Sequence, residues 1–181
     1  TRRFYEVLGL NIGHIATQFT SYDLLSAQEA GETINLEDSF EEGGATVKFG
    51  AVVGNPPYQE SDGGAQQSAR SIYPQFIAAA ESLDPEFMSF VIPSRWYSGG
   101  KSLGDFRAAM LADAHMSELH DFPKPEEVFP ETNNRGGVCY FLRDTNYDTV
   151  KAGGTRILTR DAQDVEFDVV RPLDTFGMGA F

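Results

Sequence analysis

The sequence has few cations, one cysteine and no long apolar run. Lysine and arginine together number 14, against 27 aspartates and glutamates, and the formal net charge is −13 at pH 7. A protein that binds nucleic acid tightly by itself is expected to neutralise phosphates with a basic surface. This acidic composition therefore argues against a domain that binds nucleic acid on its own. No run reaches the length of a membrane span and no segment reads as a secretory signal, so we expect no membrane partner.

The single cysteine, Cys139, lies in the apolar run Val138–Leu142. This context predicts a buried, unreactive thiol, and the absence of a cysteine pair fits a reducing, cytoplasmic location. The three histidines (His14, His115 and His120) do not have the spacing of metal ligands, so we predict no metal site.

From residue 47 onward, short apolar segments alternate with helical patterns. Strands are expected at residues 47–53, 87–92, 116–122, 137–142, 155–158 and 165–170, with amphipathic helices after residues 72 and 103. This order predicts βαβ units, and therefore an α/β, Rossmann-like, mostly parallel sheet with helices on both faces. The near-continuous apolar run at 87–92 is typical of a strand buried on both faces.

One segment combines a short apolar strand with an unusual turn: residues 49–59 read FGAVVGNPPYQ. Two consecutive prolines fix two φ angles and push the residue before each into an extended conformation, which makes the turn stiff. In an open α/β sheet, ligands bind beyond the carboxyl ends of the strands, where this turn would lie. It would hold the Asn55 side-chain oxygen, the Pro56 carbonyl and the Tyr58 ring in a fixed relation.

Two acceptors beside a ring face suit a planar heteroaromatic group that carries an amino group. Such an amine is a weak nucleophile because its lone pair is delocalised into the ring. Accepting both N–H hydrogens favours a more tetrahedral nitrogen with an available lone pair, and Tyr58 would stack on the base with about 1–3 kcal/mol. Inside duplex DNA the base must first be flipped out. The segment therefore predicts amino-group methylation, against the alternative of a rigid turn with Tyr58 merely packed.

Gly54–Tyr58 resembles motif IV of the S-adenosylmethionine-dependent amino-methyltransferases. The segments that follow it resemble, in their order, adenine-N6 DNA methyltransferases of the γ arrangement from restriction–modification systems, over about residues 36–143. These segments are Ile72–Phe76, Phe90–Trp96, Val128–Pro130 and Gly136–Leu142.

The resemblance implies roles for individual residues. Asn55, Pro56, Pro57 and Tyr58 would form the catalytic site at the target amine. Phe129 would contact the flipped base, with core packing as the alternative. An acidic residue near the cofactor adenine would be Asp38, or alternatively Asp23.

The family also has a glycine-rich loop for S-adenosylmethionine, and the sequence before residue 50 contains no such loop. A target-recognition domain is not evident either. We therefore expect a partial chain that lacks the first strands of the sheet, is inactive alone, and meets DNA and the cofactor through the remainder of a larger methyltransferase. Residues 1–45 would form a helical and loop lead-in, 46–145 part of the catalytic domain, and 146–181 an extension of the sheet or the start of another domain.

Three questions stay open at this point. The same four-residue motif also occurs in enzymes that methylate cytosine N4, guanine in ribosomal RNA or glutamine in proteins. A non-catalytic α/β module of a restriction complex is an alternative from another functional class. Arg95 could contact a phosphate or pair with a carboxylate.

Overall fold

The computed structural model describes residues 20–32, 48–59, 70–100, 102–131, 136–161 and 164–174 of the 181-residue chain. The chain divides into two compact units, residues 1–49 and 50–181. The described part of the first unit contains helix α2 (Ser21–Ala30).

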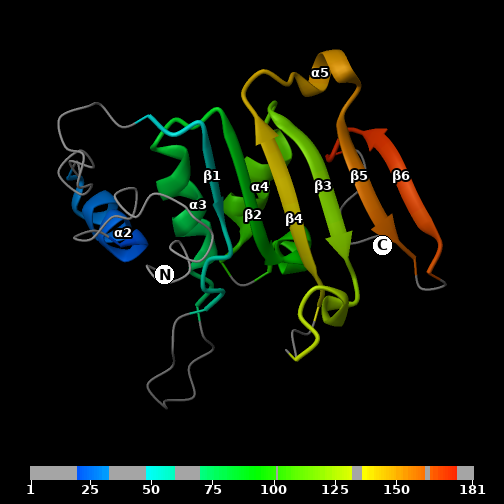
Figure 1. Ribbon diagram of the computed structural model, residues 1–181, viewed down its shortest axis with the longest axis horizontal. Coiled ribbons are helices and arrows are strands. Elements are labelled where there is room, and N and C mark those ends of the chain that lie inside the picture. Colours follow the sequence, from blue (N-terminus) through cyan, green and yellow to red (C-terminus); the bar gives the residue numbers. More distant parts are fainter. Residues whose placement is uncertain are drawn as a thin grey trace, which may run out of the picture. The chain divides into compact units, whose positions relative to one another are not determined.

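The second unit is built on a six-stranded sheet with the strand order β1-β2-β4-β3-β5-β6 (Figure 1). The strands are β1 (Ala51–Gly54), β2 (Phe87–Pro93), β3 (Met116–Phe122), β4 (Val138–Asp144), β5 (Thr155–Arg160) and β6 (Glu166–Arg171). Because β1–β2 and β3–β5 pair in parallel and β4 is antiparallel to both β2 and β3, the strands β1, β2, β3 and β5 run in one direction. Strands β4 and β6 run the opposite way. The predicted α/β fold is confirmed, and the sheet is mixed: four of its six strands share one direction, but only two of the five strand pairings are parallel.

Helices pack against one face of this sheet. They are α3 (Tyr73–Glu81), the 3-10 helix η3 (Ser94–Ser98) and α4 (Gly104–Ala112), while η4 (Pro125–Glu127) and α5 (Thr149–Ala152) are short connecting turns. The core joins Tyr73 and Ile77 of α3 and Met110 of α4 to buried side chains of the central strands. The strand residues in this core are Met88, Phe90, Ile92, Met116, Leu119, Cys139, Phe141 and Ile157.

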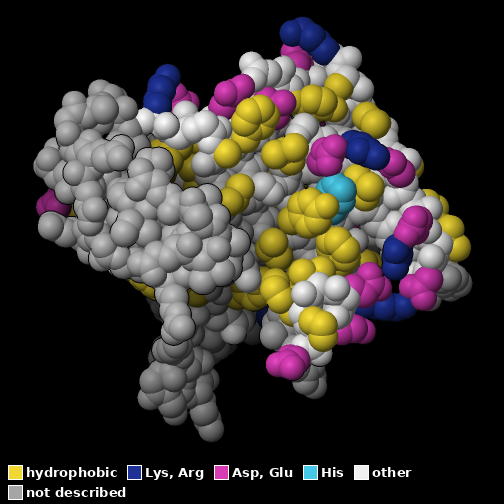
Figure 2. Space-filling model, in the orientation of Figure 1, with side chains coloured by type: hydrophobic (Ala, Val, Ile, Leu, Met, Phe, Trp, Pro, Cys, Tyr) yellow, Lys and Arg dark blue, Asp and Glu magenta, His cyan; other side chains and the backbone are white. Residues whose placement is uncertain are grey.

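The opposite face of the sheet is only partly covered within the described residues. In β2, Met88, Phe90 and Ile92 are buried while the alternate positions are half-buried, so the prediction of full burial on both faces is wrong for this strand. The physical reason is that α3 and α4 share one face, although helices on both faces were predicted. Figure 2 shows hydrophobic side chains and a histidine gathered on the more open face.

The predicted elements match the observed ones closely. The strand expected at 116–122 has the bounds of β3, and those expected at 87–92 and 137–142 lie within one or two residues of β2 and β4. Strand β1 begins at Ala51 rather than at residue 47. In the part of the chain that the structure describes, no helix is long and apolar enough to cross a membrane.

Candidate active site at the carboxyl edge of the sheet

The proline turn lies at the edge of the sheet where β1 ends. Asn55 directly follows Gly54, the last residue of β1, and its side chain is exposed, whereas Pro56 is buried and Pro57 is exposed. Burial of the first proline beside an exposed asparagine anchors the turn and presents the Asn55 amide to solvent. The predicted site is therefore accessible to a ligand rather than enclosed in the core.

Tyr58 completes the turn, and its ring is half-buried with its hydroxyl group inside the protein. That hydroxyl has no hydrogen-bond partner among the described residues, and burial raises the pKa of the Tyr58 phenol, with a smaller contribution from the Cys139 thiol. The Tyr58 main-chain oxygen accepts a 3.3 Å hydrogen bond from the Ile72 N–H, just before α3. The tip of the ring is thus buried and the backbone of Tyr58 is fixed by Ile72, while part of the residue stays exposed and could meet a stacking partner.

Two acceptors of the turn are unused in the described part of the chain. Neither the Asn55 side-chain amide nor the Pro56 carbonyl has a hydrogen-bond partner among the described residues. Gly54, just before the turn, has no side chain to clash with the next strand. A Cβ atom on it would lie 2.9 Å from Cε1 of Phe90 in β2. The glycine before the asparagine therefore lets β1 pack closely on β2.

The segment after β2 ends at the same edge, since β1 and β2 are parallel neighbours. There η3 carries Ser94 and Trp96 into the interior and leaves Arg95 exposed. The Trp96 indole N–H donates to the Cys139 sulfur at 3.4 Å, and burial raises the pKa of that thiol to about 11. The predicted buried cysteine is confirmed.

Asp121 is a buried residue of this edge that the sequence analysis missed. Its Oδ1 accepts hydrogen bonds from the Ser94 hydroxyl at 2.8 Å and the Tyr97 hydroxyl at 3.0 Å, and its Oδ2 accepts one from Thr159 at 3.2 Å. Burial raises the pKa of the Asp121 carboxyl, and the hydrogen bonds from Ser94, Tyr97 and Thr159 oppose that rise. A lone aspartate in a strand pattern gives no local signal of partners that lie 24 to 38 residues away.

The other predicted site residues have different outcomes. Phe129, half-buried, follows β3 and η4, and its N–H donates to the Pro125 carbonyl at 2.8 Å. Its contact with a flipped base stays a prediction. Asp38 lies outside the described residues.

The alternative acidic residue, Asp23, has a clear local role in the first unit. Its carboxylate accepts from the Thr20 hydroxyl at 2.6 Å and from the Thr20 N–H at 2.7 Å, while its own N–H donates to the Thr20 hydroxyl at 3.3 Å. These contacts form a capping box at the start of α2 and lower the pKa of Asp23. A role for Asp23 in cofactor binding stays a prediction.

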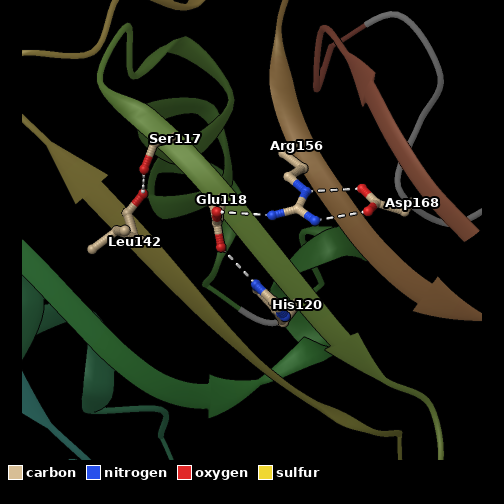
Figure 3. Close-up of polar contacts among 6 residues, drawn as sticks. All are labelled: Ser117, Glu118, His120, Leu142, Arg156 and Asp168. Carbon is tan, nitrogen blue, oxygen red and sulfur yellow. Dashed lines mark hydrogen bonds and ion pairs between the residues drawn. The ribbon is translucent and has the colours of Figure 1, made fainter.

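A chain of charged groups crosses the open face on the other half of the sheet (Figure 3). Glu118 of β3 contacts His120 at 2.8 Å and Arg156 of β5 at 3.3 Å, and Arg156 binds both carboxylate oxygens of Asp168 in β6. The His120 ring stacks on Tyr140, with 4.2 Å between the ring centroids. His120 is thus accounted for by neighbours in the sheet, and no cluster of three metal-ligating side chains occurs among the described residues.

Known proteins resemble this chain over part of their length. An uncharacterized adenine-specific methylase of Mycoplasma pneumoniae is 29% identical over 114 residues, which cover 61% of this chain and 27% of that protein. The chain therefore spans about a quarter of this curated relative. The crystal structure of the type I restriction-modification system methyltransferase subunit from Streptococcus thermophilus aligns with a TM-score of 0.43 and 16% identity, over 79% of this chain and 33% of that one.

The family comparison covers more of the chain. The model of the Eco57I restriction-modification methylase family matches residues 8–129, about two thirds of the sequence. The matched region contains β1, the proline turn, β2, η3 and β3. The chain therefore belongs to the Eco57I restriction-modification methylase family.

Proposed function

We propose that this chain supplies the target-base site of a DNA methyltransferase that transfers a methyl group from S-adenosylmethionine to N6 of a flipped adenine, within a restriction–modification system. The observation that carries this proposal is the proline turn at the carboxyl edge, where an exposed Asn55 and a half-buried Tyr58 flank a buried Pro56. Family membership supports the methylase chemistry. The name of the Mycoplasma relative supports adenine as the target base.

In this site, the Asn55 side-chain oxygen and the Pro56 carbonyl accept the two N–H groups of the adenine amine. Both acceptors lack competing partners in the described part of the chain, so the incoming amine would displace only solvent. The hydrogen bonds draw the nitrogen toward tetrahedral geometry, and Tyr58 holds the base by stacking. The N–C bond would form as the bond between the methyl carbon and the cofactor sulfur breaks, with its electron pair left on sulfur. The nitrogen would then give up one proton to solvent, so no strong base is required in advance.

S-adenosylmethionine would supply an activated methyl group when bound. The described residues do not form a recognisable site for it, because Asp23 is engaged with Thr20 and Asp38 lies outside the described ranges. We therefore assign to the described residues the target-base side of the reaction only. The longer methylase polypeptide would contribute the cofactor side.

The test uses the methylase polypeptide that carries this chain, with tritiated S-adenosylmethionine and unmethylated plasmid DNA. Hydrolysis of the product and separation of its nucleosides should yield N6-methyladenine. Asn55→Ala should lower turnover about 100-fold, the effect typical of removing a hydrogen bond that strengthens in the transition state, while DNA affinity changes little.

The matched control is Asn146→Ala, because Asn146 is an asparagine outside the predicted site whose amide donates to Glu86 at 3.0 Å. This control should keep wild-type turnover. If the product were N4-methylcytosine, the target base would be cytosine and not adenine. Unchanged turnover in Asn55→Ala would refute the site.

A further inference from the structure

The lysines and arginines of this acidic chain differ in whether they form ion pairs with carboxylates. Many lysines and arginines of the second unit pair with carboxylates on β3, β5 and β6 or on the neighbouring loops. These ion-paired cations are Lys124, Arg143, Lys151, Arg156 and Arg160. Since acidic residues outnumber basic ones by 27 to 14, pairing is the expected state of a cation here.

Arg95 and Arg70 differ from that pattern. Both are exposed, and neither guanidinium makes an ion pair or a hydrogen bond with any residue in the described ranges. Both also belong to segments next to the proline turn. Among the described residues of the second unit, these two exposed arginines without an ion pair therefore lie near the proposed target-base site.

Arg95 is held at the edge of the sheet by its surroundings. It is the second residue after β2, whose carboxyl end lies at the same edge as that of β1 and the Asn55 that follows. Its side-chain stem lies against Gly136, where an added Cβ atom would come within 3.3 Å of the Arg95 Cγ. The Ser98 hydroxyl donates to its carbonyl at 3.0 Å, and the preceding Ser94 is bound to Asp121.

Arg70 precedes a segment that pairs with the residue after the proline turn. An isolated antiparallel bridge pairs Gln59 with Ser71, and the Ile72 N–H donates to the Tyr58 carbonyl. These contacts hold Ser71, which follows Arg70, beside Gln59, which follows Tyr58. Arg95 and Arg70, which have no ion pair among the described residues, thus flank the proline turn, one from the segment after the adjacent strand and one from the returning chain.

We propose that Arg95 and Arg70 bind phosphate groups of the DNA strand on either side of the flipped base; this rests on the proposed function of the turn. A guanidinium offers a planar fork of N–H donors that matches phosphate geometry and carries a permanent charge. Such contacts position the duplex without reading its sequence. They also suggest how a chain with a net charge of −13 meets DNA, because Arg95 and Arg70 have no carboxylate partner among the described residues.

The experiment measures DNA binding by the methylase polypeptide that carries this chain. The probe is a fluorescein-labelled duplex with one adenine opposite an abasic site, titrated by fluorescence anisotropy at salt concentrations between about 50 and 200 mM. The variants Arg95→Gln and Arg70→Gln remove the charge but keep a long side chain, so the packing of Arg95 on Gly136 is largely preserved. Lys151→Gln is the matched control, since it makes the same charge change in α5, which precedes β5 and lies away from the carboxyl edge.

Each of the two arginine variants should raise Kd about tenfold at low salt, the effect of one charged hydrogen-bonded contact. Each should also make the slope of log Kd against log salt shallower by about 0.9, and the double variant by about twice that. Lys151→Gln should change neither quantity. Slopes equal to that of the control would overturn the proposal, and a change in only one variant would remove the other arginine from it.

Failure of this inference is separable from failure of the proposed function. The two failures are read from different quantities: Arg95→Gln is expected to change the affinity for DNA and its salt dependence, whereas Asn55→Ala is expected to lower turnover with affinity retained. If Asn55→Ala is active while Arg95→Gln loses its salt slope, the phosphate contacts hold and the target-base assignment is wrong. A polypeptide that binds the probe with no salt dependence would overturn both arginine contacts.

Discussion

The Ser94 hydroxyl, at the start of η3, donates a 2.8 Å hydrogen bond to Asp121 of β3, although β4 lies between β3 and β2, the strand that η3 follows. Tyr97 and Thr159 donate to the same carboxylate, so one buried acid joins η3, β3 and β5. The segment that it fixes carries Arg95 and lies beside the proline turn. Asp121 therefore holds this edge of the sheet together through hydrogen bonds that link three elements.

The first prediction concerns the hydroxyl groups that Asp121 satisfies. Asp121→Ala would leave three buried donors without their acceptor and should lower the free energy of unfolding by about 2–4 kcal/mol. Asp121→Asn should cost far less, because the amide oxygen can accept from Ser94 and Tyr97 while its NH2 donates to the Thr159 oxygen. Urea unfolding followed by circular dichroism measures both variants. Equal losses would mean that burial volume, and not hydrogen bonding, sets the stability at this position.

The second prediction is a pH dependence from the same carboxyl. Burial raises the pKa of Asp121 in the folded state above its unfolded value of about 3.9. The folded protein then binds more protons than the unfolded chain in the interval between these two values. Its contribution to stability is therefore present at acidic pH and is lost as pH rises through that interval. Subtracting the unfolding free energies of Asp121→Asn from those of the wild type across this range should expose the decline; a flat difference would contradict it.

The third prediction tests the close approach of β1 and β2. Gly54→Ala would place a methyl group 2.9 Å from the buried Phe90 ring, and should destabilise the protein by about 1–3 kcal/mol. Phe90→Leu removes that ring edge, so the added cost of Gly54→Ala should shrink to less than half in the double variant. Gly50→Ala is the matched control, because nothing lies within 4 Å of its Cβ position. Additive costs in the double-mutant cycle would show that Phe90 is not the source of the penalty.

The fourth prediction separates stacking from hydrogen bonding at Tyr58. Its hydroxyl has no partner in the described residues, so Tyr58→Phe should be neutral or stabilise the fold by about 1 kcal/mol, and it should keep base binding. Tyr58→Ala should weaken binding of a duplex with an unpaired adenine by about 1–3 kcal/mol. Tyr73→Phe serves as control, since its buried hydroxyl also lacks a described partner but lies outside the turn. If Tyr58→Phe is as damaging as Tyr58→Ala, the hydroxyl and not the ring face carries the function.

The fifth prediction uses the thiol. Burial raises the pKa of Cys139 to about 11, so at pH 8 its thiolate should be about 100-fold scarcer than that of an ordinary cysteine. Native protein should resist alkylation by iodoacetamide, and protein unfolded in urea should react fully, as read by mass spectrometry. Rapid labelling of the native chain would place Cys139 at an accessible surface.

The positions of the strands could be predicted from sequence because each is a short apolar segment bounded by turn residues. The 87–92 segment shows this most clearly, since five of its six residues are apolar. The pattern could not say which face of β2 is covered. That depends on α3 and α4 lying on the same face, which is a property of their packing and not of the strand itself.

The sequence by itself determined the proline turn and its placement after a strand, because two consecutive prolines and their steric limits are local properties of the chain. Only the tertiary structure decided what surrounds it. Parallel pairing of β1 with β2 brings Asn55 and Arg95 to one edge, and the Asp121 hydrogen bonds arise between residues far apart in sequence. Which cations form ion pairs within the described ranges was decided in the same way, because an ion pair depends on distance in space and not on distance along the chain.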